Sequence, residues 1–100
     1  MNTDSTAEAK PTEAEIERRN RIRLAVWAYA YEIKAEHLVD DATYDKVSLS
    51  IRPDLKTGHT VLDAFFENEF SPDTGLWIYR HPEFDKVASY YKYLKRIKAC

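Results

Sequence analysis

The chain has 100 residues, of which 44% are hydrophobic and 32% are charged, and its formal net charge is −2 at pH 7. This length suits one domain with one modest core, and the low count of two glycines and four prolines argues against a loop-rich or disordered chain. The acidic balance excludes an overall basic footprint for nucleic acid. Cys100 is the single cysteine, so no intramolecular disulfide can form.

The N-terminal residues predict neither a signal peptide nor an anchor. No apolar run approaches the ~20 residues of a membrane-spanning helix, and residues 1–19 contain no apolar segment of the secretory kind. We therefore expect a cytoplasmic protein with no membrane partner. Residues 1–11 are small and polar, which predicts a disordered tail before a single helical domain over 12–100.

A long segment without glycine or proline predicts the first helix, over residues 13–36. Thr12 and Glu15 have the spacing of a capping box, in which each side chain accepts a hydrogen bond from the other's backbone amide. From residue 22 onward the apolar residues recur at helical spacing over more than half of the circumference. We expect the second half of this helix to be central and the charged stretch 17–21 (ERRNR) to be solvated.

Three further segments follow. Asp40 is a good N-cap for a helix over 41–51, and Thr60 predicts the start of a third helix that reaches residue 70. The sequence SPDTG is a strong turn signal, and the LWIY that follows it is either a short extended piece or a packed loop. The last helix is expected to start at His81-Pro82, with proline in the first helical position.

These segments predict an all-α fold of three to four helices. The helices over 13–36 and 41–51 should form an antiparallel hairpin, and the C-terminal helix should pack against it. The apolar spacing predicts that eight aromatic side chains are largely buried: Trp27, Tyr31, Tyr44, Phe65, Phe66, Trp77, Phe84 and Tyr91.

The stretch 29–47 (YAYEIKAEHLVDDATYDKV) resembles the N-terminal subdomain of the bacterial NAD-dependent DNA ligases. In that family a helical hairpin carries the pattern Tyr-x-Tyr-His, a short connection, and then Asp-Ala-Glu-Tyr-Asp. Tyr29 and Tyr31 match the paired tyrosines. Asp41-Ala42 and Tyr44-Asp45 match the second half without a gap.

The resemblance implies a site for the nicotinamide half of NAD, where aromatic side chains contact the ring and carboxylates contact the ribose. It implies these ligand-binding residues: Tyr31, Glu32, Asp41, Tyr44 and Asp45. Nicotinamide mononucleotide or NAD would bind weakly, because a second domain completes the site in the family. Glu32 stands where the family has a histidine, and its charge would repel a phosphate-bearing ligand.

The chain lacks the Lys-x-Asp-Gly motif whose lysine takes AMP in a ligase, and it has no room for the other ligase domains. The resemblance therefore implies a non-catalytic binding domain rather than an enzyme, which contacts a nicotinamide nucleotide or a protein that holds one. Free-standing relatives of this kind resemble phage or prophage proteins.

Other patterns have simpler explanations. Ring packing between two antiparallel helices is an alternative role for Tyr31 and Tyr44, and a motif of this strength favours it over ligand contact. Asp73-Thr74-Gly75 also occurs in aspartic proteases, but among helices it indicates a turn. The three histidines and Cys100 lack metal-ligand spacing, so no metal site is predicted.

Two basic clusters, over 18–23 and 92–98, are explained by solvated helix faces and by the helix dipole. Because 17 carboxylates oppose a polyanion, we expect no useful affinity for DNA. A second functional hypothesis is a protein-interaction module or inhibitor that binds a host protein. Its partner-binding residues would be the aromatics of a turn-rich stretch, Phe70, Trp77 and Tyr79.

Overall fold

The computed structural model describes residues 10–99, with side chains described as far as residue 97. The predicted disordered tail over 1–11 lies outside the described residues except for its last two. The elements are α2 (Glu13–Lys34), α3 (Asp41–Ser50), α4 (Thr60–Asn68), the 3-10 helix η1 (Leu76–Arg80) and α5 (Phe84–Ala99). No strand occurs in the described part, so the all-α prediction is confirmed.

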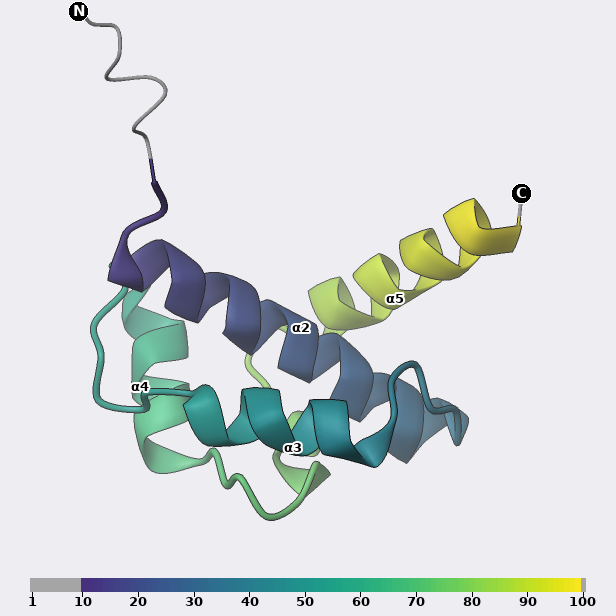
Figure 1. Cartoon of the computed structure of the whole chain (residues 1–100), viewed down its shortest axis with the longest axis horizontal. Coiled ribbons are helices and arrows are strands. Elements are labelled where there is room, and N and C mark those ends of the chain that lie inside the picture. The colour runs from purple at the N-terminus through teal and green to yellow at the C-terminus, as the bar shows by residue number, and fades with distance from the viewer. Residues whose placement is uncertain (1–9, 100) are drawn as a thin grey trace, which may run out of the picture.

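Helix α2 crosses the whole molecule, and the other elements pack around it (Figure 1). α3 returns beside α2, and Arg52, just after α3, hydrogen-bonds Glu13 in the first turn of α2 at 3.1 Å. This arrangement is consistent with the predicted antiparallel hairpin. α5 packs against α2 as expected, since the Tyr29 ring contacts Phe84 and Tyr91 at centroid distances of 5.5 and 5.3 Å. The last turns of α5 extend beyond the other helices (Figure 1).

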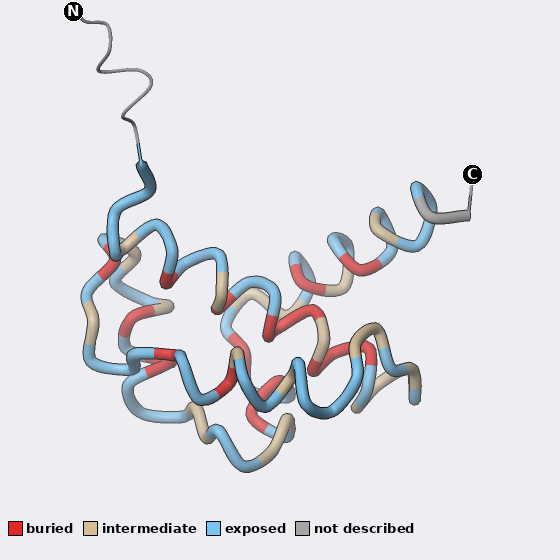
Figure 2. Tube along the Cα trace, in the orientation of Figure 1, coloured by how far each residue is buried: buried red, intermediate tan, exposed pale blue. Residues whose placement is uncertain are grey.

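The core lies along the second half of α2, as the apolar spacing predicts (Figure 2). This half contributes six buried apolar residues, namely Leu24, Ala25, Val26, Ala28, Tyr29 and Ala30. α4 adds Phe65 and Phe66, and η1 adds Trp77 and Ile78. No helix of the described chain is both long and apolar enough to cross a membrane.

The ends of α2, α3 and α4 and the start of α5 differ from the prediction by one to three residues, and the N-cap of α4 differs as well. α2 stops two residues early, because Ala35 adopts the left-handed conformation (φ 53°) and its amide bonds to the Ala30 carbonyl. α4 is capped by His59 Nδ1, which accepts from the Leu62 amide at 3.3 Å, and not by Thr60. α5 begins at Phe84 rather than at His81-Pro82.

The charged stretch 17–21 is not solvated throughout, and that prediction was wrong. Arg21 is only 3% exposed, and its guanidinium lies 2.8 Å from the Glu17 carboxylate and 2.9 Å from the Asp63 carboxylate. The same guanidinium donates to the carbonyls of Arg52 and Leu55. Burial of this arginine is tolerated because its charge and its donors are all satisfied.

The prediction for the eight aromatics is confirmed in part. Phe65, Phe66, Trp77 and Tyr91 are buried, whereas Trp27, Tyr44 and Phe84 are half-buried. Tyr31 is 52% exposed, so its predicted burial was wrong. Its ring packs edge-on against His37 in the link after α2 (centroids 4.8 Å apart) rather than beneath another helix.

Candidate functional site

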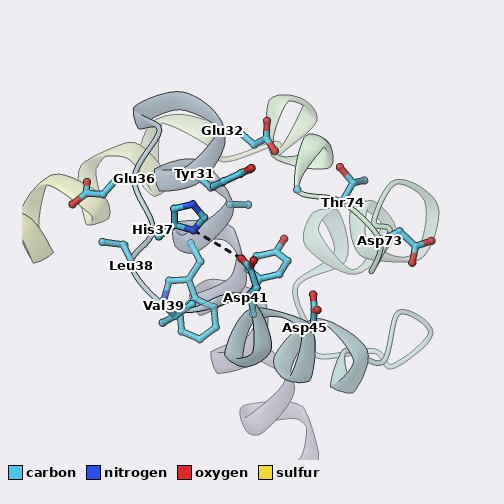
Figure 3. A pocket seen from close by; sticks show the side chains of 14 residues that line it. Tyr31, Glu32, Glu36, His37, Leu38, Val39, Asp41, Asp45, Asp73 and Thr74 are labelled. Carbon is cyan, nitrogen blue, oxygen red and sulfur yellow. Dashed lines mark ion pairs between the residues drawn. The ribbon is translucent and has the colours of Figure 1, made fainter.

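A pocket of ≈ 270 Å³ opens where α2 ends and α3 begins (Figure 3). Four segments line it: the last turns of α2, the link 36–39, the first turns of α3 and the loop 73–75. All five residues that the ligase resemblance implies for ligand binding line this one pocket: Tyr31, Glu32, Asp41, Tyr44 and Asp45.

Helix geometry brings these residues together. Asp41, Tyr44 and Asp45 share one face of α3 at the i, i+3 and i+4 positions, and α3 is fixed at its start by Asp40, whose carboxylate accepts from the Thr43 amide at 2.8 Å. Hydrogen bonding by the Thr43 side chain and by its backbone amide holds the pKa of Asp40 below its usual range. The left-handed Ala35 turns the chain out of α2 so that the link can border the pocket.

The aromatic part of the pocket combines an exposed ring with a half-buried one. Tyr31 stacks edge-on with His37, and the described part of the chain contains no ring contact between Tyr31 and Tyr44. The alternative role of this pair, ring packing between helices, is therefore not what the structure contains. The Tyr44 hydroxyl is buried and has no hydrogen-bond partner among the described residues. Burial raises the pKa of Tyr44 to about 12, although the nearby Trp77 indole opposes the shift, and the charges of Glu32 and Asp45 add to it, so the phenol stays neutral.

The charged part of the pocket is acidic. Five carboxylates line it, and no lysine or arginine of the described chain does: the acids are Glu32, Glu36, Asp41, Asp45 and Asp73. Glu36 accepts hydrogen bonds from the Tyr91 hydroxyl and from Lys95. His37 is the one basic side chain in the lining, and its Nδ1 lies 3.9 Å from an Asp41 oxygen (Figure 3).

Sequence reasoning missed several lining residues, above all Trp27, His37 and the 73–75 loop. Residues 72–73 do form a turn, as predicted, yet the turn also closes one side of the pocket. At Gly75 an added Cβ would lie 3.4 Å from both the Ala28 side chain and the Tyr44 hydroxyl. The glycine therefore keeps the pocket open where loop and helices meet, and its place after the turn was the only signal in the sequence.

The three predicted partner-binding residues, Phe70, Trp77 and Tyr79, do not form an exposed surface together. Trp77 is 4% exposed, and its indole packs against Phe65, Phe66 and Phe70 while Nε1 donates to the Thr74 carbonyl at 2.8 Å. Its use as an exposed anchor is therefore corrected, because the 3-10 turn directs it into the core. Phe70 is half-buried against Trp77. Tyr79 alone of the three is exposed.

An apolar groove of ≈ 390 Å³ lies on another side of α2, bordered by α4 and α5. Its apolar lining consists of Ile22, Ala25, Val26, Leu62, Phe66, Val87 and Tyr90, with Arg18 and Lys86 among its charged residues. Ile22 and Tyr90 are substantially exposed. His81 is buried in the groove wall, and burial lowers its pKa to about 4 although Glu83 opposes the shift.

Among residues 10–99 no three His, Cys, Asp or Glu side chains gather in a way that could hold a metal ion. A scan against protein-family models finds no match, and comparisons with curated proteins and with solved structures find no similar protein.

Proposed function

We propose that this protein is a non-catalytic cytoplasmic domain that binds the nicotinamide half of a nicotinamide nucleotide, either free or held by a protein partner. The observation that supports this proposal is the meeting of five residues in one pocket. The ligase resemblance selects them from two separate segments, residues 31–32 and 41–45. Side chains from both segments border the same hollow.

The composition of the pocket suits a heteroaromatic ring on a sugar. Tyr31, His37 and Tyr44 offer ring faces and edges, and such groups pack well against a planar ligand. The carboxylates of Asp41 and Asp45 can accept hydrogen bonds from ribose hydroxyls. The buried Tyr44 hydroxyl can still donate one hydrogen bond, for which the carboxamide oxygen of nicotinamide is a suitable acceptor.

The size of the pocket favours half a dinucleotide over a whole one. Its volume of ≈ 270 Å³ lies just below the range of roughly 300–1,000 Å³ that small-molecule sites occupy. A ring and a sugar are therefore the largest groups that it can enclose. Because the pocket is open to solvent, we expect millimolar rather than micromolar affinity for the isolated domain.

An NMR titration of the ¹⁵N-labelled protein with nicotinamide mononucleotide tests this proposal. We expect concentration-dependent shift changes at Tyr31, Asp41, Tyr44 and Asp45, while the amides of α4 stay unchanged. The variant Gly75→Leu should abolish these changes, because its side chain would extend from the site where a Cβ already contacts Ala28 and Tyr44. Unchanged α4 signals in that variant serve as the control for folding. Absence of shift changes in the unmodified protein at millimolar ligand would contradict the proposal.

We propose protein binding as a second candidate function, at the groove between α2, α4 and α5. The observation that favours it is the exposed apolar lining, because contiguous apolar surface of this kind marks interaction sites. The groove is bordered by helices, which suits the apolar face of an amphipathic helix from a partner. Lys86 is paired with Glu83 of the same groove at 3.4 Å, so Arg18 is the lining cation that favours an acidic residue in that partner.

Matched variants of the immobilised protein test this second candidate. Ile22→Glu places a charge in the groove, and Leu49→Glu places the same charge on α3, where Leu49 is 73% exposed and lies outside both hollows. A protein retained from extract by the Leu49→Glu variant and lost with Ile22→Glu is the expected outcome. Equal sets of retained proteins would remove this candidate.

We also propose that DNA is not a ligand. In the first basic cluster (residues 18–23), Arg21 is buried between Glu17 and Asp63 and is not available to a phosphate. In the second cluster Lys95 is paired with Glu36. The other cations of the two clusters that the structure describes lie on exposed helix surfaces and would neutralise few phosphates.

A further inference from the structure

The charges around the pocket decide which nicotinamide compound it can accept. Glu32, Asp41 and Asp45, here called the central carboxylates, lie between Glu36 and Asp73, which are at the two outer sides of the pocket (Figure 3). Lys95 pairs with the outer Glu36, so the three central carboxylates lie away from that compensating cation. A ligand in the centre is therefore exposed to a field that favours positive charge.

The helix ends at the pocket act in the same direction. α2 ends at the pocket, and the carbonyls of a last helical turn carry partial negative charge. The N-terminus of α3 is the one helix end there that could hold a phosphate. It is already occupied, because the Asp40 carboxylate accepts from the Thr43 amide and Asp41 adds a second negative charge in the first turn.

The aromatic side chains suit a cation as well. A positively charged group within about 6 Å of a tyrosine ring face is attracted by the ring quadrupole, and Tyr31 presents a half-exposed ring at the pocket edge. The pyridinium ring of an N-ribosylated nicotinamide carries a permanent positive charge. A phosphate on the same ribose adds about −1.5 to −2 charges at pH 7, which the central carboxylates would repel.

We infer that the pocket selects a cationic aromatic ligand that lacks a phosphate group, with nicotinamide riboside as its representative. This inference rests on the proposed function, since it names the ligand class of the same site. It also gives a physical role to Glu32, which stands where the ligase pattern has a histidine. A carboxylate at this position disfavours the phosphorylated ligand and favours the cation.

The experiment is a titration of the whole chain with four compounds: nicotinamide riboside, nicotinamide mononucleotide, neutral nicotinamide and tetramethylammonium. We expect nicotinamide riboside to bind about tenfold more tightly than the mononucleotide at 0.05 M salt, a modest difference for several like charges around one site. Neutral nicotinamide should bind more weakly than the riboside. The preference over the mononucleotide should shrink at 1 M salt, where the screening length falls to about 3 Å.

Two variants, one inside the pocket and one outside it, sharpen this test. The double variant Glu32→Gln with Asp45→Asn should reduce or reverse the preference for the riboside, because it removes two central charges. Asp54→Asn removes an exposed charge in the loop before α4, outside the pocket, and should leave the preference unchanged.

The outcomes separate this inference from the proposed function. If the mononucleotide binds as tightly as the riboside or more tightly, the inference is overturned and the proposed function stands. If tetramethylammonium binds and no nicotinamide compound does, the pocket attracts cations without recognising nicotinamide, and both the inference and the proposed function are overturned. Absence of binding by all four compounds overturns both.

Discussion

The pocket between α2 and α3 and the groove between α2 and α5 use the same helix but differ in the chemistry of their walls. The pocket is lined by carboxylates and exposed aromatic rings, with no lysine or arginine in its described lining. The groove is lined mainly by aliphatic and aromatic carbon, with Arg18 beside it and with Lys86 paired to Glu83. A cation is therefore suited to the pocket, and an apolar or anionic group is suited to the groove.

The two hollows also differ in how their polar groups are satisfied. Beside the groove, the buried Arg21 binds two carboxylates and two carbonyls, so its donors are used within the protein. In the pocket the buried Tyr44 hydroxyl has no partner among the described residues. A satisfied buried network stabilises the fold, whereas an unsatisfied buried donor costs stability and is available to a ligand. The polar groups beside the groove are therefore used within the fold, whereas the proposed ligand site keeps one buried hydroxyl without a partner among the described residues.

Loss of the Arg21 charge should produce the largest effect on stability. In Arg21→Met, Glu17 and Asp63 stay buried without their shared partner. Breaking a buried ion pair in this way costs about 3–5 kcal/mol of unfolding free energy, which urea denaturation would measure. The matched variant Arg18→Met changes an exposed arginine one turn earlier and should cost less than about 0.5 kcal/mol.

A rescue variant keeps this prediction testable if Arg21→Met fails to fold. Adding Glu17→Gln and Asp63→Asn removes the two unpaired charges while leaving oxygen acceptors for the amides of Arg52 and Thr57. Most of the lost stability should return. If Arg21→Met alone is as stable as Arg18→Met, the ion cluster contributes nothing to the fold and the contrast between the two hollows fails.

Acid should destabilise the protein through His81 in the groove wall. Burial lowers the pKa of His81 from 6.5 to about 4, so between these values the unfolded chain binds a proton that the folded chain does not. Stability should therefore fall as the pH is lowered from 6.5 to 4, by roughly 3 kcal/mol in total. His81→Asn keeps an acceptor for the Glu83 amide and should flatten this part of the pH profile.

The acid effect of Asp63 lies in a separate window. Although burial opposes the shift, hydrogen bonds from Thr57 and Arg21 lower the pKa of Asp63 below its ordinary 3.8. Its contribution to stability is therefore lost only below that value.

For the His81 prediction, an unchanged slope of stability against pH between 6.5 and 4 in His81→Asn would show that another group causes the loss of stability in acid.

Tyr44→Phe should affect stability and binding in opposite directions. Removing a buried hydroxyl without a partner should leave stability unchanged or raise it by about 1 kcal/mol. Affinity for nicotinamide riboside should fall at the same time, because the donor to the carboxamide is lost. Thermal unfolding and ligand titration measure the two effects. Unchanged affinity would show that the hydroxyl does not contact the ligand.

The sequence predicted the helices better than it predicted which individual side chains are buried. Periodicity located α2, α3 and α5, and capping signals located the starts of α2 and α3, because both depend on residues a few positions apart. Burial of Arg21 could not be predicted locally, since its partner Asp63 lies 42 positions away in the chain. Tyr31 was misassigned for the related reason that no later element covers this part of α2.

The smallest effect on stability should come from the exposed lining of the groove, and a fluorescent probe can still detect it. 8-Anilinonaphthalene-1-sulfonate binds exposed apolar surface, and its sulfonate is suited to the groove near Arg18 and is repelled by the carboxylates of the pocket. Ile22→Glu should lower the probe's fluorescence several-fold while changing stability by about 0.5 kcal/mol or less, because Ile22 is half exposed. Asp45→Asn should leave the fluorescence unchanged. If both variants lower it equally, the probe does not distinguish the two hollows, and their difference in wall chemistry does not control what they bind.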